Sequence, residues 1–335
     1  MLGAVMLGIE GTALLGEERE RLRHPAVGGV ILFARNYADP AQLSALTADI
    51  RSLRSPPLLI AVDQEGGRVQ RCREGFTALP AAGQIGRAGE MAPALALEAA
   101  EQAGWLMATE LRECDVDFSF APVLDLDYGV SSVIGDRSLG RDPNVVAELA
   151  LAWQRGAKAA GMISVGKHFP GHGGVAPDSH HARATDPRML ADLVHADLLP
   201  FRRLINNGLA AVMMAHVEYP QVDDKPAGFS DRWTGYLRND LGFEGAIFSD
   251  DLEMAGAAAA GDLQARAVAA INAGCDMVII GNAGREADQL LDRIPASDSR
   301  SALRLARLHG RRALDSDPDY IAKRKASARA LLAEL

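Results

Sequence analysis

The sequence is poor in cysteine, which narrows the class of protein. Cys72, Cys114 and Cys275 are the only cysteines among 335 residues, and they are scattered without C-x-x-C spacing. A disulfide framework of the kind that staples small secreted domains uses an even set of closely spaced cysteines. We therefore expect a protein of a reducing compartment, the cytoplasm.

The sequence also lacks an excess of positive charge and any long apolar run. Its formal net charge is −9, which is poorly suited to binding phosphate backbones or anionic lipid. The N-terminal stretch MLGAVMLGIEG has no basic segment before it and reaches Glu10 early, unlike a signal peptide or a membrane span. We expect no nucleic-acid partner and no membrane attachment, and we expect this stretch to form a buried strand.

The hydrophobic content of 48% is sufficient for a large core, and it is arranged in short apolar runs that alternate with helix-period patterns such as ALALEAAEQAGWLMATELREC. The runs cover residues 5–9, 28–33, 58–62, 118–123, 162–165, 211–215, 246–248 and 277–280. Continuous apolar strands that alternate with amphipathic helices indicate parallel strands buried on both faces. Eight such units predict a (β/α)8 barrel, with a doubly wound open sheet as the alternative. No repeat or linker divides the chain, so we expect a single domain over residues 1–335.

Polar side chains follow several of these runs. Asp63 comes after the third run, Lys167 and His168 after the fifth, His216 after the sixth and Asp250 after the seventh. Active sites of (β/α)8 barrels lie at the carboxyl ends of the strands. We therefore expect these side chains to converge at one mouth of the barrel.

The stretch KHFPGHGGVAPDSHH, residues 167–181, contains four of the eight histidines. A metal site is one interpretation, but His168, His172, His180 and His181 share one glycine-rich loop without the H-E-x-x-H helix that orients zinc ligands. A nucleotide site is another, since GMISVGKH matches G-x-x-x-x-G-K, but His168 stands where that loop needs Ser or Thr. The sequence predicts neither a metal nor a cofactor.

Proton transfer is the interpretation that the loop favours. In an extended backbone, alternate side chains lie on the same side, so Asp178 and His180 can meet while Ser179 points away. A carboxylate that contacts an imidazole stabilises its protonated form, which suits a general acid/base at neutral pH. A serine hydrolase is disfavoured because no G-x-S-x-G motif occurs.

The motifs KHFPGHG, DSH and FSDD, in this order and between GVILFARN and GNAGR, resemble those of the family 3 glycoside hydrolases. Among these the chain is most similar to the single-domain bacterial β-N-acetylhexosaminidases. The resemblance implies a (β/α)8 barrel, a retaining mechanism without metal or cofactor, and a cytoplasmic role in cell-wall recycling. The expected partners are peptidoglycan-derived, GlcNAc-containing saccharides and muropeptides, from which a terminal N-acetylglucosamine (GlcNAc) is removed. We expect the chain to act as a monomer.

The resemblance also assigns roles to individual residues. Asp250 would be the nucleophile, with Asp251 only its neighbour, and His180 would be the acid/base with Asp178 as its partner. The residues expected to bind the substrate are Asp63, Arg71, Arg137, Lys167 and His168. His216, Arg35 and Glu65 are candidates for supporting roles outside this set, and His172 is expected to shape its loop.

Two alternatives stay open at this point. Because a histidine acid/base does not repel an anion, phosphate could replace water in the second step and make the protein a phosphorylase. A catalytically silent glycan-binding barrel is the other alternative.

Overall fold

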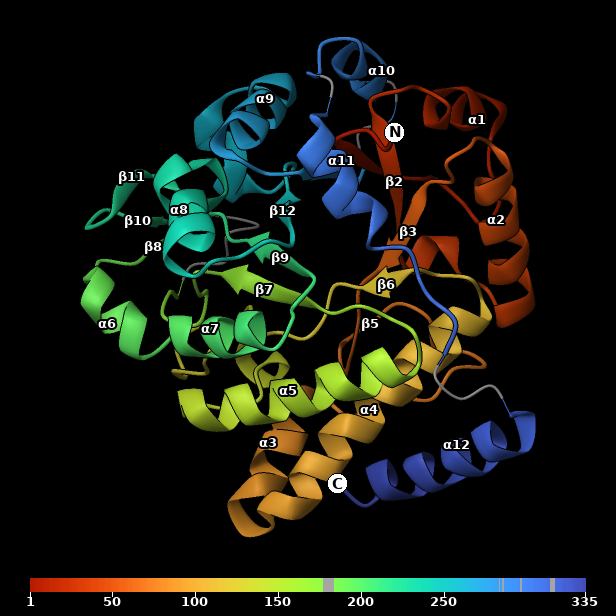
Figure 1. Ribbon diagram of the computed structural model, residues 1–335, viewed down its shortest axis with the longest axis vertical. Coiled ribbons are helices and arrows are strands. Elements are labelled where there is room, and N and C mark those ends of the chain that lie inside the picture. The colour runs from red at the N-terminus through yellow and green to blue at the C-terminus, as the bar shows by residue number, and fades with distance from the viewer. Residues whose placement is uncertain (177–183, 283, 285, 296, 314–316) are drawn as a thin grey trace.

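The centre of the molecule is an eight-stranded parallel sheet that curves into a barrel surrounded by helices (Figure 1). The computed structural model describes residues 1–176, 184–282, 284, 286–295, 297–313 and 317–335. In spatial order the strands are β6, β3, β2, β1, β13, β12, β9 and β7. Their bounds are β1 (Val5–Gly8), β2 (Val27–Leu32), β3 (Leu59–Val62), β6 (Phe118–Ser119), β7 (Val165–Phe169), β9 (Ala211–Met214), β12 (Ala246–Asp251) and β13 (Met277–Ile280).

The two ends of this strand order meet, which closes the barrel. Val123, just after β6, forms a parallel bridge with Lys167 in β7. The backbone N–H of Val165 donates to the carbonyl of Ala121 at 2.8 Å, and that of Leu124 donates to the carbonyl of Lys167 at 2.7 Å. The (β/α)8 prediction is therefore confirmed, and the doubly wound open sheet is wrong.

Aromatic side chains fill part of the barrel interior. Phe118 of β6 and Phe248 of β12 belong to strands that are not neighbours, yet their ring centroids lie 5.8 Å apart. Phe120 packs edge-to-face against both rings, at 5.4 and 5.3 Å. Such pairs contribute about 0.5–1.5 kcal/mol each beyond the burial of apolar area. The interior is thus a packed core, which leaves the ends of the strands for ligands.

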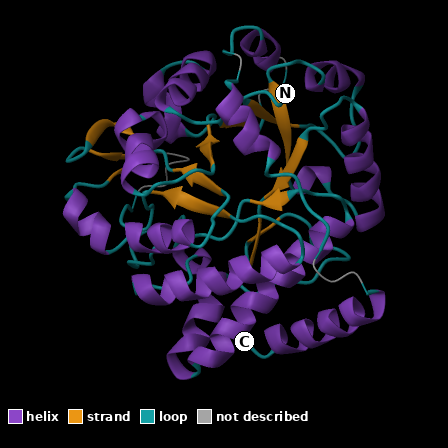
Figure 2. Ribbon diagram, viewed as in Figure 1, coloured by secondary structure: helices purple, strands orange, loops and turns teal. Residues whose placement is uncertain are grey.

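Helices cover the outside of the barrel (Figure 2). Those in the described residues are α1 (Gly16–Leu22), α2 (Pro40–Ser52), α3 (Ala82–Met91), α4 (Pro93–Glu113), α5 (Pro143–Ala159), α6 (Leu190–His195), α7 (Leu198–Asn206), α8 (Asp231–Gly235), α9 (Leu263–Ala273), α10 (Glu286–Leu291), α11 (Ser299–Ala306) and α12 (Pro318–Ala333). Asp39 and Asp142 begin α2 and α5 by accepting backbone N–H bonds, each just before a proline at the first helical position. Within the described residues, no helix combines the length and the apolar character that crossing a membrane requires.

The site end of the barrel carries two small additions. A hairpin of β4 (Gln64–Gly66) and β5 (Val69–Gln70) follows β3 directly. A second sheet joins β8 (Ala184–Thr185), β10 (Val217–Tyr219) and β11 (Asp223–Pro226). Both additions extend the loops that follow barrel strands.

Three predicted strands have boundaries that differ from the structure by more than one residue, and each difference has a physical cause. The predicted run ends at Val165, but β7 begins there and continues through the polar residues Lys167 and His168. β12 likewise includes Asp250, because its charged end is still paired with β13. β6 is shorter than its run, which contains Pro122, a residue without an N–H for the ladder.

Candidate active site

A cavity of about 390 Å³ opens at the carboxyl ends of the barrel strands. This volume lies within the range of small-molecule sites, roughly 300–1,000 Å³. Six of the residues predicted from the sequence line it together: Asp63, Arg71, Arg137, Lys167, His168 and Asp250. They come from β7, β12 and the segments after β3, β5 and β6. The expected convergence at one mouth is therefore confirmed for Asp63, Lys167, His168 and Asp250, whereas His216 does not line the cavity.

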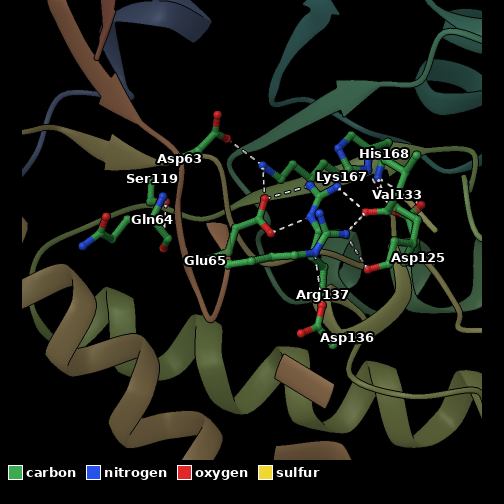
Figure 3. Close-up of polar contacts among 12 residues, drawn as sticks. Asp63, Gln64, Glu65, Ser119, Asp125, Val133, Asp136, Arg137, Lys167 and His168 are labelled. Carbon is green, nitrogen blue, oxygen red and sulfur yellow. Dashed lines mark hydrogen bonds and ion pairs between the residues drawn. The ribbon is translucent and has the colours of Figure 1, made fainter. Parts of the chain in front are cut away.

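Lys167 is a buried cation held between two carboxylates (Figure 3). Its Nζ lies 2.7 Å from Oδ1 of Asp63 and 2.6 Å from Oε1 of Glu65. Burial lowers the pKa of Lys167, but the two carboxylates outweigh burial and hold the pKa above its ordinary value. Lys167 is therefore charged, and two of its three N–H groups are occupied, which leaves one for a ligand.

Glu65 joins this lysine to Arg137, on the short helix η2 (Gly135–Arg137). The guanidinium donates from Nε to Oε2 at 2.8 Å and from Nη2 to Oε1 at 2.9 Å, a bidentate pair. Burial would raise the pKa of Glu65, but the charges of Lys167 and Arg137 hold it far below its usual range. Glu65, a residue outside the predicted binding set, thus fixes the position of two predicted binding residues.

The β4–β5 hairpin positions Arg71. Oε1 of Gln64 accepts the backbone N–H groups of Arg71 and Cys72 at 2.9 and 3.0 Å. The turn needs glycine at Gly66, where φ is +104° and an added Cβ would lie 2.4 Å from a backbone oxygen. Arg71 reaches Asp63 at 3.6 Å, and its buried Nε has no hydrogen-bond partner in the described residues. A donor of this kind at a cavity wall is suited to a ligand oxygen.

Asp125 holds His168 and was missed by the sequence analysis. Its Oδ2 lies 2.6 Å from Nδ1 of His168, and its carboxylate also accepts the backbone N–H groups of His168 and His172. Although burial opposes it, the two histidines hold the pKa of Asp125 below its ordinary value. Nδ1 of His168 therefore faces Asp125, and Nε2 is the ring atom left to contact a ligand. Asp125 follows the fourth apolar run just as Asp63 follows the third, and that signal was available.

Two adjacent carboxyl groups, those of Asp250 and Asp251, border the same cavity. Oδ1 of Asp250 accepts the backbone N–H of Asp251 at 2.8 Å. Burial, reinforced by the charges of Glu253 and Asp250, raises the pKa of Asp251 to about 7, although two backbone N–H groups donate to its carboxylate. Asp251 is therefore partly protonated near neutral pH.

The other sequence candidates have different places. Asp178 and His180 lie outside the described residues, so their roles stay predictions. His172 was expected only to shape its loop, but it also lines the cavity, with its ring 5.9 Å from that of His168. Arg35 donates to the backbone carbonyls of Ile9 and Gly281 and does not line the cavity. His216 is buried beside the end of β12.

The chemistry of the site follows from these contacts. Buried, charged donors and acceptors in fixed positions make strong hydrogen bonds to a neutral ligand that is rich in hydroxyl groups. The carboxylate of Asp250 supplies a nucleophile or a base. Among the described residues, no group of three or more His, Cys, Asp or Glu side chains is arranged to hold a metal ion.

Comparisons with known proteins agree on one family. The family model described as Glycosyl hydrolase family 3 N terminal domain matches residues 5–306. A protein of Methylobacillus flagellatus named Beta-hexosaminidase is 53% identical over 96% of this chain and 94% of its own length. A second protein of that name, from Alkalilimnicola ehrlichii, is 56% identical over 94% of this chain and 91% of its own. The crystal structure of NagZ from Neisseria gonorrhoeae in complex with N-trifluoroacetyl-D-glucosamine is similar with a TM-score of 0.93 and 47% identity, covering 99% of this chain and 98% of that one.

Proposed function

The chain belongs to glycoside hydrolase family 3 and is a β-hexosaminidase, and from this premise we propose that it removes non-reducing terminal GlcNAc from peptidoglycan fragments in the cytoplasm. The observation that carries the proposal is the placement of Asp250 on the wall of a cavity that is also lined by the paired charged groups of Glu65, Arg137 and Lys167. GlcNAc is neutral and rich in hydroxyl groups, so it matches this lining. The related structure with N-trifluoroacetyl-D-glucosamine supports the choice of sugar.

The proposed reaction is a double displacement. The carboxylate of Asp250 attacks the anomeric carbon, and the bond to the leaving sugar breaks while His180 gives its proton to the leaving oxygen. The resulting ester between Asp250 and GlcNAc is then attacked by water, whose proton returns to His180. Asp178 stabilises the protonated imidazole in this scheme. The anomeric configuration is retained because it is inverted twice.

The described residues would bind the sugar in this scheme. After their contacts with the described residues, Lys167, Arg71 and His168 each keep at least one polar group for it: the third N–H of Nζ, the Nε and the Nε2. Their partners Asp63, Glu65 and Asp125 keep these atoms in place before the sugar arrives. Such preorganisation lowers the entropy lost on binding.

The test is turnover of 4-nitrophenyl β-N-acetylglucosaminide by the wild type, Asp250→Ala and His180→Ala, with Asp240→Ala and His195→Ala as controls at exposed positions outside the cavity. We expect Asp250→Ala to lose activity by about 10⁴-fold or more and His180→Ala by about 10²–10⁴-fold. A chelator should leave the wild-type rate unchanged. Loss of activity on chelation, or wild-type turnover by Asp250→Ala, would contradict the proposed mechanism.

A further inference from the structure

His216 lies buried behind the proposed nucleophile. It follows β9, is 1% exposed, and its ring stacks on Phe229 with centroids 5.2 Å apart and planes 16° apart. Its Nε2 lies 3.2 Å from the backbone carbonyl oxygen of Asp251. Because a carbonyl only accepts hydrogen bonds, Nε2 carries the proton and donates it. Nδ1 has no hydrogen-bond partner in the described residues and lies against Gly228, where an added Cβ would be 3.2 Å away.

This hydrogen bond lies where the β-ladder has ended. β12 pairs with β9 only as far as Phe248, which is opposite Met213. Asp250 and Asp251 therefore extend beyond the last paired residue on the β9 side. The carbonyl of Asp251 has two donors here, the backbone N–H of Met254 at 3.2 Å and Nε2 of His216. His216 therefore adds a side-chain donor on the β9 side, where the ladder provides none.

The two polar groups of the Asp251 backbone connect His216 to the nucleophile. The carbonyl accepts from Nε2 of His216, and the N–H donates to Oδ1 of Asp250 at 2.8 Å. A shift of the Asp251 backbone would therefore move a backbone donor that contacts the Asp250 carboxylate. The stack on Phe229 keeps the imidazole itself from tilting.

We propose that His216 is a positioning residue that fixes the Asp250 carboxylate for attack on the anomeric carbon, acting through the backbone of Asp251. The inference rests on the proposed function, because it concerns the formation of the covalent intermediate. It separates His216 from the residues that bind the sugar, since His216 does not line the cavity. Loss of its donor should slow attack and leave sugar binding intact.

The experiment compares wild type, His216→Phe and His216→Gln by covalent labelling with a 5-fluoro glycosyl fluoride of GlcNAc, a probe that forms the glycosyl-enzyme faster than it hydrolyses. Phe keeps an aromatic ring against Phe229 but has no donor, whereas the amide nitrogen of Gln can reach the place of Nε2. His195→Phe makes the same change at an exposed position and is the matched control. The dissociation constant of GlcNAc is measured for each variant, and peptide mass spectrometry locates the label.

We expect the labelling rate constant of His216→Phe to fall about 10- to 100-fold, as for loss of a buried hydrogen bond, with GlcNAc binding unchanged within about twofold. His216→Gln should label within about fivefold of the wild type. Three outcomes would overturn this inference while leaving the proposed function intact. They are labelling of His216→Phe at the wild-type rate, a loss of labelling in parallel with a loss of GlcNAc binding, and equal losses of labelling in His216→Phe and His216→Gln. Absence of label on Asp250 in the wild type would overturn the proposed function and this inference with it. If His216→Phe does not fold, His216→Met, which also lacks the donor, takes its place. A ratio of labelling to binding in His216→Met equal to that of the wild type would overturn the inference, since a purely structural role would not change this ratio.

Discussion

At the scale of single residues, the site depends on carboxylates that serve other side chains. Glu65 receives both Lys167 and Arg137, and Asp125 receives His168 together with two backbone N–H groups. Charged groups this deeply buried are tolerated only when they are paired. The proposed binding residues therefore depend on their buried carboxylate partners, so a substitution of a partner tests the binding residue as well.

Glu65→Gln tests the first of these pairs. The amide keeps the shape but leaves Lys167 and Arg137 with one carboxylate fewer, so we expect the free energy of unfolding to fall by about 3–5 kcal/mol and KM to rise. Urea unfolding and steady-state kinetics measure both effects. Asp136→Asn is the matched control, because the partly exposed Asp136–Arg68 pair should contribute only about 0–1 kcal/mol. Equal destabilisation by the two substitutions would contradict the role of Glu65.

Asp251 predicts a pH dependence of stability. Its pKa in the folded state is about 7, above the ordinary value of 3.8, so the folded protein binds the proton more tightly than the unfolded chain. This contribution is fully present below about pH 4 and is lost as the pH rises through about 7. The amide of Asp251→Asn does not titrate, so the stability of this variant lacks the loss that the wild type undergoes as the pH rises. The free energy of unfolding of Asp251→Asn relative to the wild type should therefore increase by a few kcal/mol between about pH 5 and about pH 8. Urea unfolding at both pH values, with the exposed Asp240→Asn as control, measures the difference, and a pH-independent difference would contradict the prediction.

Residue-scale prediction from sequence succeeded where position along a strand was informative. Asp63 and Asp250 were found because they end or follow apolar runs, and the structure places both at the cavity. Asp125 also follows an apolar run but was not predicted, because it does not belong to the motifs on which the family resemblance was based. The bidentate pairing of Glu65 with Arg137 could not be predicted, since it joins β4 to η2 between residues that are 72 positions apart in the sequence.

At the scale of elements, hydrophobic periodicity predicted the helices that alternate with the strands. The close approach of α4 and α5, however, depends on a glycine. α4 and α5 touch where Gly156 lies against the backbone of α4, and an added Cβ there would be 1.9 Å from the carbonyl oxygen of Glu101. Hydrophobic periodicity indicates which face of a helix is buried, but it does not show how closely two backbones approach. The contact was therefore not predictable from the pattern alone.

Gly156→Ala tests this contact. The methyl group cannot fit without separation of the two helices, so we expect the free energy of unfolding to fall by about 1–3 kcal/mol, the usual cost of overpacking. Gly16→Ala is the control, because an added Cβ at Gly16 would meet nothing within 4 Å. Urea unfolding distinguishes the two variants. Equal stability of Gly156→Ala and the wild type would show that the helices can separate without cost.

At the scale of the whole molecule, eight short runs sufficed to predict the architecture, because parallel strands buried on both faces leave few alternatives. Closure itself was not readable from sequence. It depends on backbone bonds between the segment after β6 and β7, formed by residues 121–124 and 165–167. Those bonds bring Lys167 to the same rim as Asp63, so closure of the barrel also assembles the site.

Because the site joins residues from distant parts of the chain, a ligand that fits it should stabilise the whole barrel. GlcNAc at 100 times its dissociation constant should add about 2.7 kcal/mol to the free energy of unfolding. For a chain of this length that corresponds to a rise in Tm of about 4 °C. Asp250→Ala should keep the shift, because Asp250 is proposed to react with the sugar more than to bind it, whereas Lys167→Ala should lose most of it. Thermal unfolding with and without GlcNAc measures the effect, with mannitol as a hydroxyl-rich control. A shift of equal size with mannitol, or one that survives in Lys167→Ala, would mean that the stabilising site is not this cavity.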